Sequence, residues 1–361
     1  MSDIRLDRAR EVRTGEELDR EALEAYLAEH LPGFQGPLEI QQFPSGHSNL
    51  TYFLKGGEAE YVLRRPPFGA RIKTAHDMGR EFRILSGLHP HYPKLPKPLL
   101  HCEDESVLGA PFYVMQRLRG IILRTPQAVE KMGLSEGTVR GISESLVDGL
   151  VELHRVDLQA TDLAGFGKPE GYVQRQVSGW TKRYLNAKTD EVPEVEQAAA
   201  WLAEHQPGEV GAALIHGDFK HDNLVLDPDD PTRIIGILDW EMATVGDPLM
   251  DLGTTLGYWV DPSDRPEVQM LPVGPTLAPG TLDRRQVVER YAERSGQDPG
   301  NGLFYYVYGL FKVAVIAQQI YKRFVEGHTK DPRFAMMIVG VNLLGQQAAV
   351  AIERDRIHDL G

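Results

Sequence analysis

The chain has 361 residues, of which 42% are hydrophobic and 25% charged, and this composition excludes a disordered, fibrous or membrane-spanning class of protein. The net charge of −13 argues against a dedicated binder of nucleic acid or anionic membranes, because such proteins need surplus positive charge to neutralise phosphates. At about 150 residues per domain, the length predicts two or three lobes with enough chain for a large core.

Three features of the sequence predict a cytoplasmic protein. The single cysteine, Cys102, cannot form an internal disulfide, which is typical of chains in a reducing compartment. The segment 1–13 alternates charged residues and lacks the apolar core of a secretory signal. The longest apolar stretch, 303–321, is interrupted by Lys312 and two glutamines, so we expect no transmembrane helix.

The first third of the chain predicts a small antiparallel sheet accompanied by two helices. Apolar residues at helical spacing indicate helices over 17–30 and 75–88, and the prolines that follow prevent the second helix from continuing. Short β-rich runs bounded by Gly and Pro predict five strands, at 38–43, 50–54, 61–64, 99–101 and 112–116.

From residue 138 onward the pattern is mostly helical. Helices are predicted over 138–155, 170–186, 193–205, 283–295, 303–326 and 333–354. The Pro- and Gly-rich segment 261–280 is predicted to be a long connecting loop. The fold class is therefore α+β, with a small sheet-rich lobe over 1–117 and a larger helical lobe over 118–361.

The most informative stretch is a polar loop, HGDFKHDN over 216–223, between two short apolar strands. Asp218 and Asn223 can face one small site from this tight loop, and Asp239 follows the next hairpin strand. Together they supply a base and two oxygen ligands. Magnesium prefers such hard oxygen donors and usually completes its shell with waters and substrate phosphates.

This stretch resembles the kinase-like phosphotransferases that include aminoglycoside and choline kinases, and especially a subgroup associated with acyl-CoA dehydrogenases. HGDFKHDN matches the family's catalytic loop, Asp-Trp-Glu at 239–241 matches its metal-binding motif, and the likeness extends over about residues 30–325. The resemblance implies a protein-kinase-like two-lobe fold with ATP and Mg²⁺ as cofactors. It implies that Asp218 orients the substrate hydroxyl and accepts its proton, while Asn223 and Asp239 hold Mg²⁺.

The same resemblance implies roles for three neighbouring residues. Lys220 occupies the place of a lysine that touches the transferred phosphate, so it is expected to balance developing charge. Asp251 matches an aspartate that braces the catalytic loop by hydrogen bonds, and His216 is expected to support the loop in the same way. We interpret Asp251 and His216 as structural support rather than as chemistry.

The third strand carries a motif, 61–64, that resembles the one whose basic residue pairs with the phosphates of ATP. Arg64 stands where distant kinases carry lysine, and its guanidinium can grip a phosphate bidentately. Glu81 lies in the following helix at a suitable distance to pair with it. Arg65 takes the place of Arg64 if the strand register differs by one. The alternative is that Arg64 and Glu81 form only a surface ion pair, which contributes little.

Two further segments of the small lobe are candidates for nucleotide contact. The loop 43–51 would cover the phosphates through backbone N–H groups, although a plain hairpin turn explains it equally well. Its candidate residues are Ser45, Gly46, Ser48 and Asn49. The segment 111–118 resembles the strand that leads into the hinge between the lobes, where Gln116 and Leu118 would meet the adenine edge.

Only eleven residues separate Asp239 from Asp251, too few for the activation segment and peptide platform of protein kinases. We therefore expect a small-molecule acceptor, with no nucleic-acid or membrane partner. The acceptor is expected to lie near Asp218 against the helical lobe. The candidate contacts are Tyr258, Tyr305, Lys312 and Arg323.

Charge divides two classes of acceptor. Aminoglycosides are polycations that need a carboxylate-lined cleft, which the net charge favours weakly, whereas hydroxyacyl-CoA thioesters need Lys or Arg near the site. The family resemblance favours a hydroxylated acyl-CoA or related metabolite, with a functional link to an acyl-CoA dehydrogenase. The basic residues that favour the same class are Lys312, Arg323, Arg64, Arg65, Arg71 and Lys73.

Alternatives from other classes remain open at this point. A nucleotide sensor would keep the pocket without the transfer step, and inverted nucleotide binding would transfer AMP instead of a phosphoryl group. Asp218 and Asp222 could simply cap a hairpin turn. A hydrolase metal site on His216, Asp218 and His221 would lack the second histidine pair that such sites need.

Overall fold

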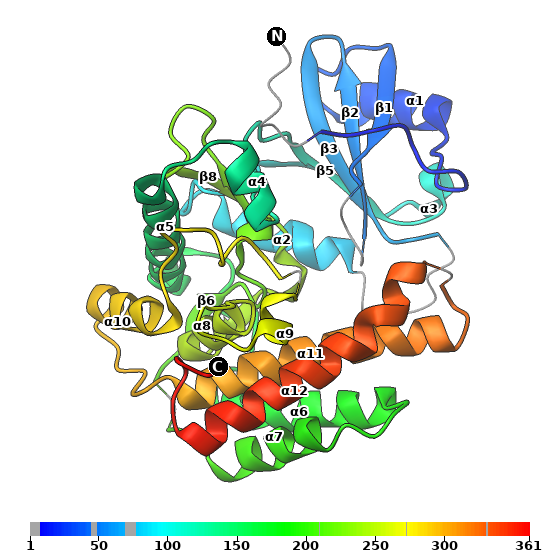
Figure 1. Ribbon diagram of the computed structural model, residues 1–361. Helices are drawn as coiled ribbons and strands as arrows, with labels where there is room; N and C mark the ends of the chain where they lie inside the picture. The colour runs from blue at the N-terminus through cyan, green and yellow to red at the C-terminus, as the bar shows by residue number, and fades with distance from the viewer. Residues whose placement is uncertain (1–7, 45–48, 69–76, 209, 272, 330) are drawn as a thin grey trace.

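The computed structural model describes residues 8–44, 49–68, 77–208, 210–271, 273–329 and 331–361. Figure 1 shows a small sheet-containing lobe, here called the N-lobe, next to a larger helical C-lobe in which α6, α7, α11 and α12 lie side by side. The predicted α+β class is confirmed, with a five-stranded sheet in the first part of the chain and mostly helices after it.

The N-lobe is built on one antiparallel sheet with the strand order β1-β2-β3-β5-β4. Its strands are β1 (Leu38–Gln42), β2 (Leu50–Gly56), β3 (Ala59–Arg65), β4 (Pro98–Cys102) and β5 (Phe112–Gln116). Its helices are α1 (Arg20–His30), α2 (Met78–Leu88) and α3 (Glu105–Leu108). All five strands and both long helices match the sequence expectation.

The alternation of side chains along β3 decides which residues of this strand reach the C-lobe. Val62 packs in the same core as α2, whereas Leu63 packs in the separate core that contains α1. Because successive side chains point to opposite faces of a strand, Arg64 follows Val62 toward α2 and Arg65 follows Leu63 to the other face. The pleat therefore resolves the choice between the two arginines.

The C-lobe contains most of the helices. They are α4 (Pro126–Lys131), α5 (Glu136–His154), η1 (Leu158–Ala160), α6 (Tyr172–Ala187), α7 (Pro193–Glu204), α8 (Pro248–Gly257), α9 (Pro266–Gln269), α10 (Arg284–Ser295), α11 (Leu303–Val325), η4 (Pro332–Met336) and α12 (Met337–Arg354). The described residues of the segment 261–280, which are 261–271 and 273–280, form a loop except for α9. A Cβ on Gly309 would lie 1.9 Å from the Gly253 carbonyl oxygen, so glycine lets α8 and α11 touch through their backbones.

Two short antiparallel pairs carry the polar loops between the lobes. They are β6 (Ala213–Ile215) with β9 (Thr244–Gly246), and β7 (Leu224–Leu226) with β8 (Ile234–Ile237). The single-turn helix η2 (His221–Asn223) forms the end of the first polar motif, and the single-turn helix η3 (Trp240–Met242) begins at the second residue of the other motif. The β6–β9 pair was not predicted.

Two segments of the described chain are long and apolar enough to cross a membrane by length and composition alone, Leu303–Val325 and Pro332–Arg354. The apolar window of the first is 78% buried inside the protein and that of the second is 33% buried. Core helices of globular proteins pass the same test, and α11 packs against α8, α6 and α12.

Candidate active site

The loop after β6 is held by a buried carboxylate on α8. Asp251 accepts hydrogen bonds from the backbone N–H groups of His216, at 2.7 Å, and Gly217, at 2.8 Å. Its Oδ2 also lies 3.2 Å from Nε2 of His154. Although burial opposes the charged form, the hydrogen bond and charge of His154 keep the pKa of Asp251 below its usual value. The carboxylate is therefore ionised and fixes two consecutive peptide groups.

Asp218 lies at the centre of a cluster of polar contacts. Nδ2 of Asn223 donates to the Asp218 carbonyl at 2.8 Å and to its Oδ2 at 3.1 Å, which leaves the amide oxygen of Asn223 for another partner. Nζ of Lys220 lies 2.8 Å from Oδ2 of Asp218. Burial opposes the charge on Lys220, but Tyr258 and Asp218 raise its pKa above the ordinary value. Lys220 therefore carries its charge beside the carboxylate.

His216 connects this loop to the strand that leads to Asp239. Its Nδ1 accepts from the Asp218 backbone N–H at 3.2 Å, and its Nε2 donates to the Leu238 carbonyl at 2.9 Å. Burial lowers the pKa of His216, in keeping with a neutral ring that accepts at one nitrogen and donates at the other. The Leu238 N–H in turn donates to the Asn223 carbonyl at 2.8 Å. The two polar motifs are thus bonded to each other.

Asp239 has a left-handed backbone conformation, with φ of 67°. Its Oδ1 accepts from Nη2 of Arg64 at 3.0 Å, and within the described chain the structure gives Oδ2 no hydrogen bond. Although burial opposes ionisation, Arg64 holds the pKa of Asp239 below its usual range. One carboxylate oxygen is therefore committed to the N-lobe and the other is available.

Arg64 and Glu81 form the ion pair that the sequence predicts, with Nη1 of Arg64 3.0 Å from Oε1 of Glu81. The pair is buried, not superficial, because the side chains are 8% and 2% exposed. Oε1 of Glu81 also accepts the Trp240 N–H at 3.2 Å. Arg65 points elsewhere, with Nη1 donating to the Leu108 carbonyl at 3.0 Å.

The remaining nucleotide candidates fall into three groups. Ser45, Gly46 and Ser48 lie outside the described residues. Asn49 is buried, and its Nδ2 donates to Oε2 of Glu241 at 2.9 Å. Gln116 is exposed with its backbone N–H bonded to the Lys97 carbonyl at 2.8 Å, and Leu118 lies against Gly236 of β8.

The acceptor candidates do not gather at one place. Tyr258 lies beside the loop, with its ring centroid 4.3 Å from Nζ of Lys220. Tyr305 is 4% exposed and packs in the core of the C-lobe, and Arg323 is exposed eleven residues beyond Lys312 on α11. The structure therefore corrects the expectation for Tyr305 and Arg323, since helical spacing places a residue on a face but does not say what covers that face.

Lys312 is buried and bonded to the catalytic loop. Its Nζ donates to the Gly217 carbonyl at 2.5 Å and to Oγ1 of Thr254 at 3.3 Å. The close approach of α8 and α11 brings the lysine to this loop. Gly217, the residue before Asp218, is thus held at its N–H by Asp251 and at its carbonyl by Lys312.

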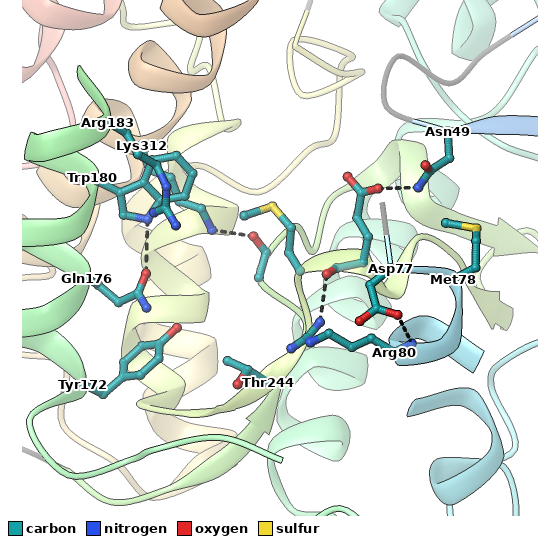
Figure 2. A pocket seen from close by; sticks show the side chains of 13 residues that line it. Asn49, Asp77, Met78, Arg80, Tyr172, Gln176, Trp180, Arg183, Thr244 and Lys312 are labelled. Carbon is teal, nitrogen blue, oxygen red and sulfur yellow. Dashed lines mark hydrogen bonds between the residues drawn. The ribbon is translucent and has the colours of Figure 1, made fainter. Parts of the chain in front are cut away.

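A cavity of about 310 Å³ opens beside this loop, between the N-lobe and α6. Figure 2 shows the side chains that line it, with α6 and α11 on one side and the start of α2 on the other. The lining residues that the sequence did not single out include Arg80, Tyr172, Gln176, Trp180, Arg183 and Glu241. The sequence pattern of an amphipathic helix with charges on its outer face does not tell whether that face meets solvent or a cavity. The spacing of Gln176, Trp180 and Arg183, which places them on one side of α6, is only a weak sequence signal for a cavity.

The site offers carboxylate and amide oxygens, and few protein ligands for a metal. Among the described residues, no group of three or more His, Cys, Asp and Glu side chains could hold a metal ion. The free amide oxygen of Asn223 and the free carboxylate oxygen of Asp239 suit Mg²⁺, which keeps waters and takes oxygens from phosphates. The donor set therefore fits this metal.

Comparisons with known proteins agree with this arrangement. A model of the phosphotransferase enzyme family matches residues 39–288. Acyl-CoA dehydrogenase family member 11 of Rattus norvegicus is 37% identical over 330 residues, covering 89% of this chain and 42% of the relative. Family member 10 of Mus musculus is 36% identical over 325 residues, covering 89% and 30%. The chain spans less than half the length of these curated relatives.

Solved structures show the same fold. A Ralstonia eutropha protein assigned to the aminoglycoside phosphotransferases is 31% identical, with a TM-score of 0.74 over 92% of this chain and 99% of that chain. The aminoglycoside phosphotransferase APH(4)-Ia, as a thermostable mutant bound to ADP and hygromycin B, is 16% identical, with a TM-score of 0.57 over 90% and 98%. The protein-kinase-like two-lobe fold is confirmed, and the chain belongs to the phosphotransferase enzyme family.

Proposed function

We propose that the protein is a small-molecule kinase that uses Mg²⁺ and ATP to transfer the γ-phosphoryl group to a hydroxyl. The observation that carries this proposal is the junction of the two polar motifs, in which Asn223 donates to Asp218 while His216 and Asn223 both bond to the backbone of Leu238, the residue before Asp239. We place the acceptor in the cavity, whose lining includes Gly217 and Glu241 of these two motifs. Membership of the phosphotransferase family supports the same chemistry.

Each of these residues would have its own role in the phosphoryl transfer. Asn223 and Asp239 would hold Mg²⁺, which when bound neutralises charge on the phosphates. Asp218 orients the acceptor hydroxyl and takes its proton. Lys220 stays charged beside Asp218 and offsets negative charge near the transferred group. Arg64, anchored by Glu81, contributes a second positive charge from the N-lobe.

For the acceptor, we favour a hydroxyacyl-CoA or a related metabolite. The support is that the curated relatives are named as acyl-CoA dehydrogenase family members and contain a region similar to this chain. The same names support a functional link to an acyl-CoA dehydrogenase. An aminoglycoside-type acceptor is the second candidate, because the Ralstonia eutropha protein at 31% identity is assigned to that class.

The direct test is a screen for ADP release with hydroxyacyl-CoAs and aminoglycosides in the same library. Mass spectrometry of the product separates an added phosphate from an added AMP. Asp218→Ala should lower kcat by about 10²-fold or more, the usual scale for a positioned base, with ATP affinity nearly unchanged. Nucleotide binding without turnover of any compound would favour a sensor, and full activity of Asp218→Ala would remove the residue from the mechanism.

A further inference from the structure

The charged side chains that line the cavity are nearly all committed to other groups. Asp77 accepts the Arg80 backbone N–H at 2.8 Å and caps α2. The guanidinium of Arg80 donates to the carbonyls of Glu241, at 3.0 Å, and Ala243, at 2.5 Å. The Glu241 carboxylate accepts from Asn49, and Lys312 is tied to Gly217. Each of these groups has a structural partner.

Arg183 differs from the other charges of the cavity. Within the described chain, the structure gives its guanidinium no hydrogen bond and no ion pair. It stacks on the ring of Trp180, 4.5 Å from the centroid, and Nε1 of Trp180 donates to Oε1 of Gln176 at 3.1 Å. The ring is therefore fixed, and it holds the guanidinium at the mouth of the cavity with its N–H groups unused.

The corner around Arg183 has an excess of positive charge. Nζ of Lys312 lies 5.6 Å from the same Trp180 ring. The pKa of Lys312 is lowered to about 8, mainly by burial, with Lys220 and Arg183 acting in the same direction and Asp218 and Asp251 opposing the shift. Asp251 is bonded to backbone groups of the loop, and Asp218 is bonded to Asn223 and Lys220. An anion in the cavity would therefore relieve the repulsion between Lys312 and Arg183.

Among the described residues, the basic side chains that the sequence offered for an anion lie elsewhere, and Arg71 and Lys73 fall outside the described residues. Arg64 is paired with Glu81 and Asp239, and Arg65 points to the Leu108 carbonyl on the other face of the sheet. Arg323 lies about 16 Å along α11 from Lys312 at 1.5 Å per residue. Arg183 is thus the described cation of the cavity that is best placed to receive a ligand.

We propose that Arg183, stacked on Trp180, binds an anionic group of the acceptor, so that the substrate is a hydroxyl compound that carries a phosphate or carboxylate. This inference rests on the proposed kinase function and deepens it. A guanidinium receives either anion through two parallel hydrogen bonds, and the cavity volume suits a small acyl chain or hydroxy acid. Polycationic acceptors would be repelled by Arg183 and Lys312.

The test compares Arg183→Gln and Arg183→Lys with Lys182→Gln, an exposed cation on the same helix that does not line the cavity. The acceptors are hydroxyacyl-CoAs, the matching hydroxyacyl-pantetheines without phosphate, and the free hydroxy acids. Arg183→Gln should raise KM for the anionic acceptors by about tenfold to a hundredfold, the scale of a lost charged hydrogen bond, with kcat little changed. Arg183→Lys should recover part of the loss, and Lys182→Gln should resemble the wild type.

The three acceptor series distinguish the source of the anion. Loss confined to the CoA esters assigns the group to a phosphate, and loss confined to the free acids assigns it to a carboxylate. An unchanged KM in Arg183→Gln, or turnover of only neutral or cationic acceptors, would overturn the subsite while leaving the kinase function intact.

A binding measurement keeps the two proposals separable. Coenzyme A and the hydroxy acids are titrated calorimetrically into protein saturated with a non-hydrolysable ATP analogue. If no compound yields ADP, the kinase proposal fails, and binding that is weakened by Arg183→Gln but not by Lys182→Gln would still support the subsite. Equal binding by both variants would overturn it.

Discussion

The two polar loops of the site are held in different ways. The loop over 216–223 is fixed from within the C-lobe, where Asp251 and Lys312 bind backbone groups of His216 and Gly217, directly before Asp218. The loop that begins at Asp239 is held mainly by N-lobe side chains, with Arg64 on its carboxylate and Glu81 on the next backbone N–H. Asp218, the proposed base, is therefore positioned by one lobe, whereas Asp239, the proposed metal ligand, depends on the contact between the lobes.

This difference has a consequence for function. A change in lobe separation would move Asp239 relative to the N-lobe but would leave Asp218 in its frame of C-lobe hydrogen bonds. Variants of the N-lobe contacts should therefore affect nucleotide and metal binding first. Variants of the C-lobe contacts should affect turnover and stability.

The largest effect is expected for Asp239→Ala. The substitution removes the carboxylate that we assign to Mg²⁺ and leaves Arg64 with Glu81 as its close partner. We expect Mg²⁺-dependent ATP affinity to fall by more than about 100-fold, since a direct ligand is lost and even the residues that only support metal ligands are worth about 10- to 100-fold in metal affinity. Calorimetric titration of ATP with Mg²⁺ or with EDTA measures this loss.

Glu241→Gln is the matched control for Asp239→Ala. Its carboxylate lies 3.8 Å from Nη2 of Arg64, so it shares the electrostatic surroundings but has no assigned metal role. The control should keep most of the affinity. Normal Mg²⁺-dependent binding by Asp239→Ala would contradict the metal assignment.

Asp251→Asn is expected to act on the other loop. The asparagine would place its NH₂ group against one of the two backbone N–H groups that donate to the Asp251 carboxylate, and His154 would lose its charged partner. We expect kcat to fall about 10- to 100-fold and the free energy of unfolding to fall by about 2–4 kcal/mol, with ATP affinity nearly unchanged. Steady-state kinetics and urea denaturation provide the two measurements.

Asp247→Asn serves as the control for Asp251→Asn. Asp247 is a buried carboxylate on the same helix, and it caps α8 through the N–H groups of Leu249 and Met250. It should lower stability without a comparable loss of kcat. If both variants lost turnover in proportion to stability, Asp251 would be a general stabiliser and not a specific support of the loop.

Arg80→Met is expected to have a smaller effect, on the N-lobe side of the comparison. Its guanidinium ties α2 to two carbonyls of the segment after Asp239, and the loss of these bonds should loosen that loop. We expect KM for ATP to rise about three- to tenfold, as for a net loss of about 1 kcal/mol, with a smaller change in kcat. Arg83→Met removes an exposed arginine of the same helix and should leave both constants unchanged. An effect of equal size in both variants would contradict this role of Arg80.

The sequence predicted the five strands of the N-lobe, the long helices and the approach of the two polar motifs to one site, because these depend on local periodicity and residue spacing. It did not predict the β6–β9 pair, since three-residue strands carry too little pattern. Tyr305 and Lys312 share a helix and a face, yet only Lys312 lines the cavity. What covers each turn of α11 depends on the contact of Gly309 with α8, which is a tertiary property.

Arg183 is a residue that the sequence did not single out but that the structure places at the cavity. An exposed arginine on an amphipathic helix has no distinguishing mark in the sequence, and the role that we propose for Arg183 depends on the place of α6 beside the cavity. The sequence predicted the partners of Arg64 and Arg65 only in part. The strand alternation separated their directions, but their partners come from α2 and α3, far along the chain.

The smallest effect on activity is expected for Asp261→Asn, which tests whether the C-lobe can be changed near Arg284 without moving Asp218. Asp261 is buried near Arg284, Asp264 and Asp283; burial raises its pKa to about 7 from 3.8, although Arg284 opposes the shift. The folded protein therefore binds a proton between pH 4 and 7 that the unfolded chain does not. This carboxyl makes the free energy of unfolding fall as the pH rises through that range, and it adds no further slope above it.

In Asp261→Asn, the free energy of unfolding should change less between pH 5 and pH 8, by about 1–2 kcal/mol, while kcat stays the same. An identical pH slope in urea denaturation would show that Asp261 does not titrate there, and a lower kcat would show that the frame and the base are more tightly coupled than the two-loop comparison implies.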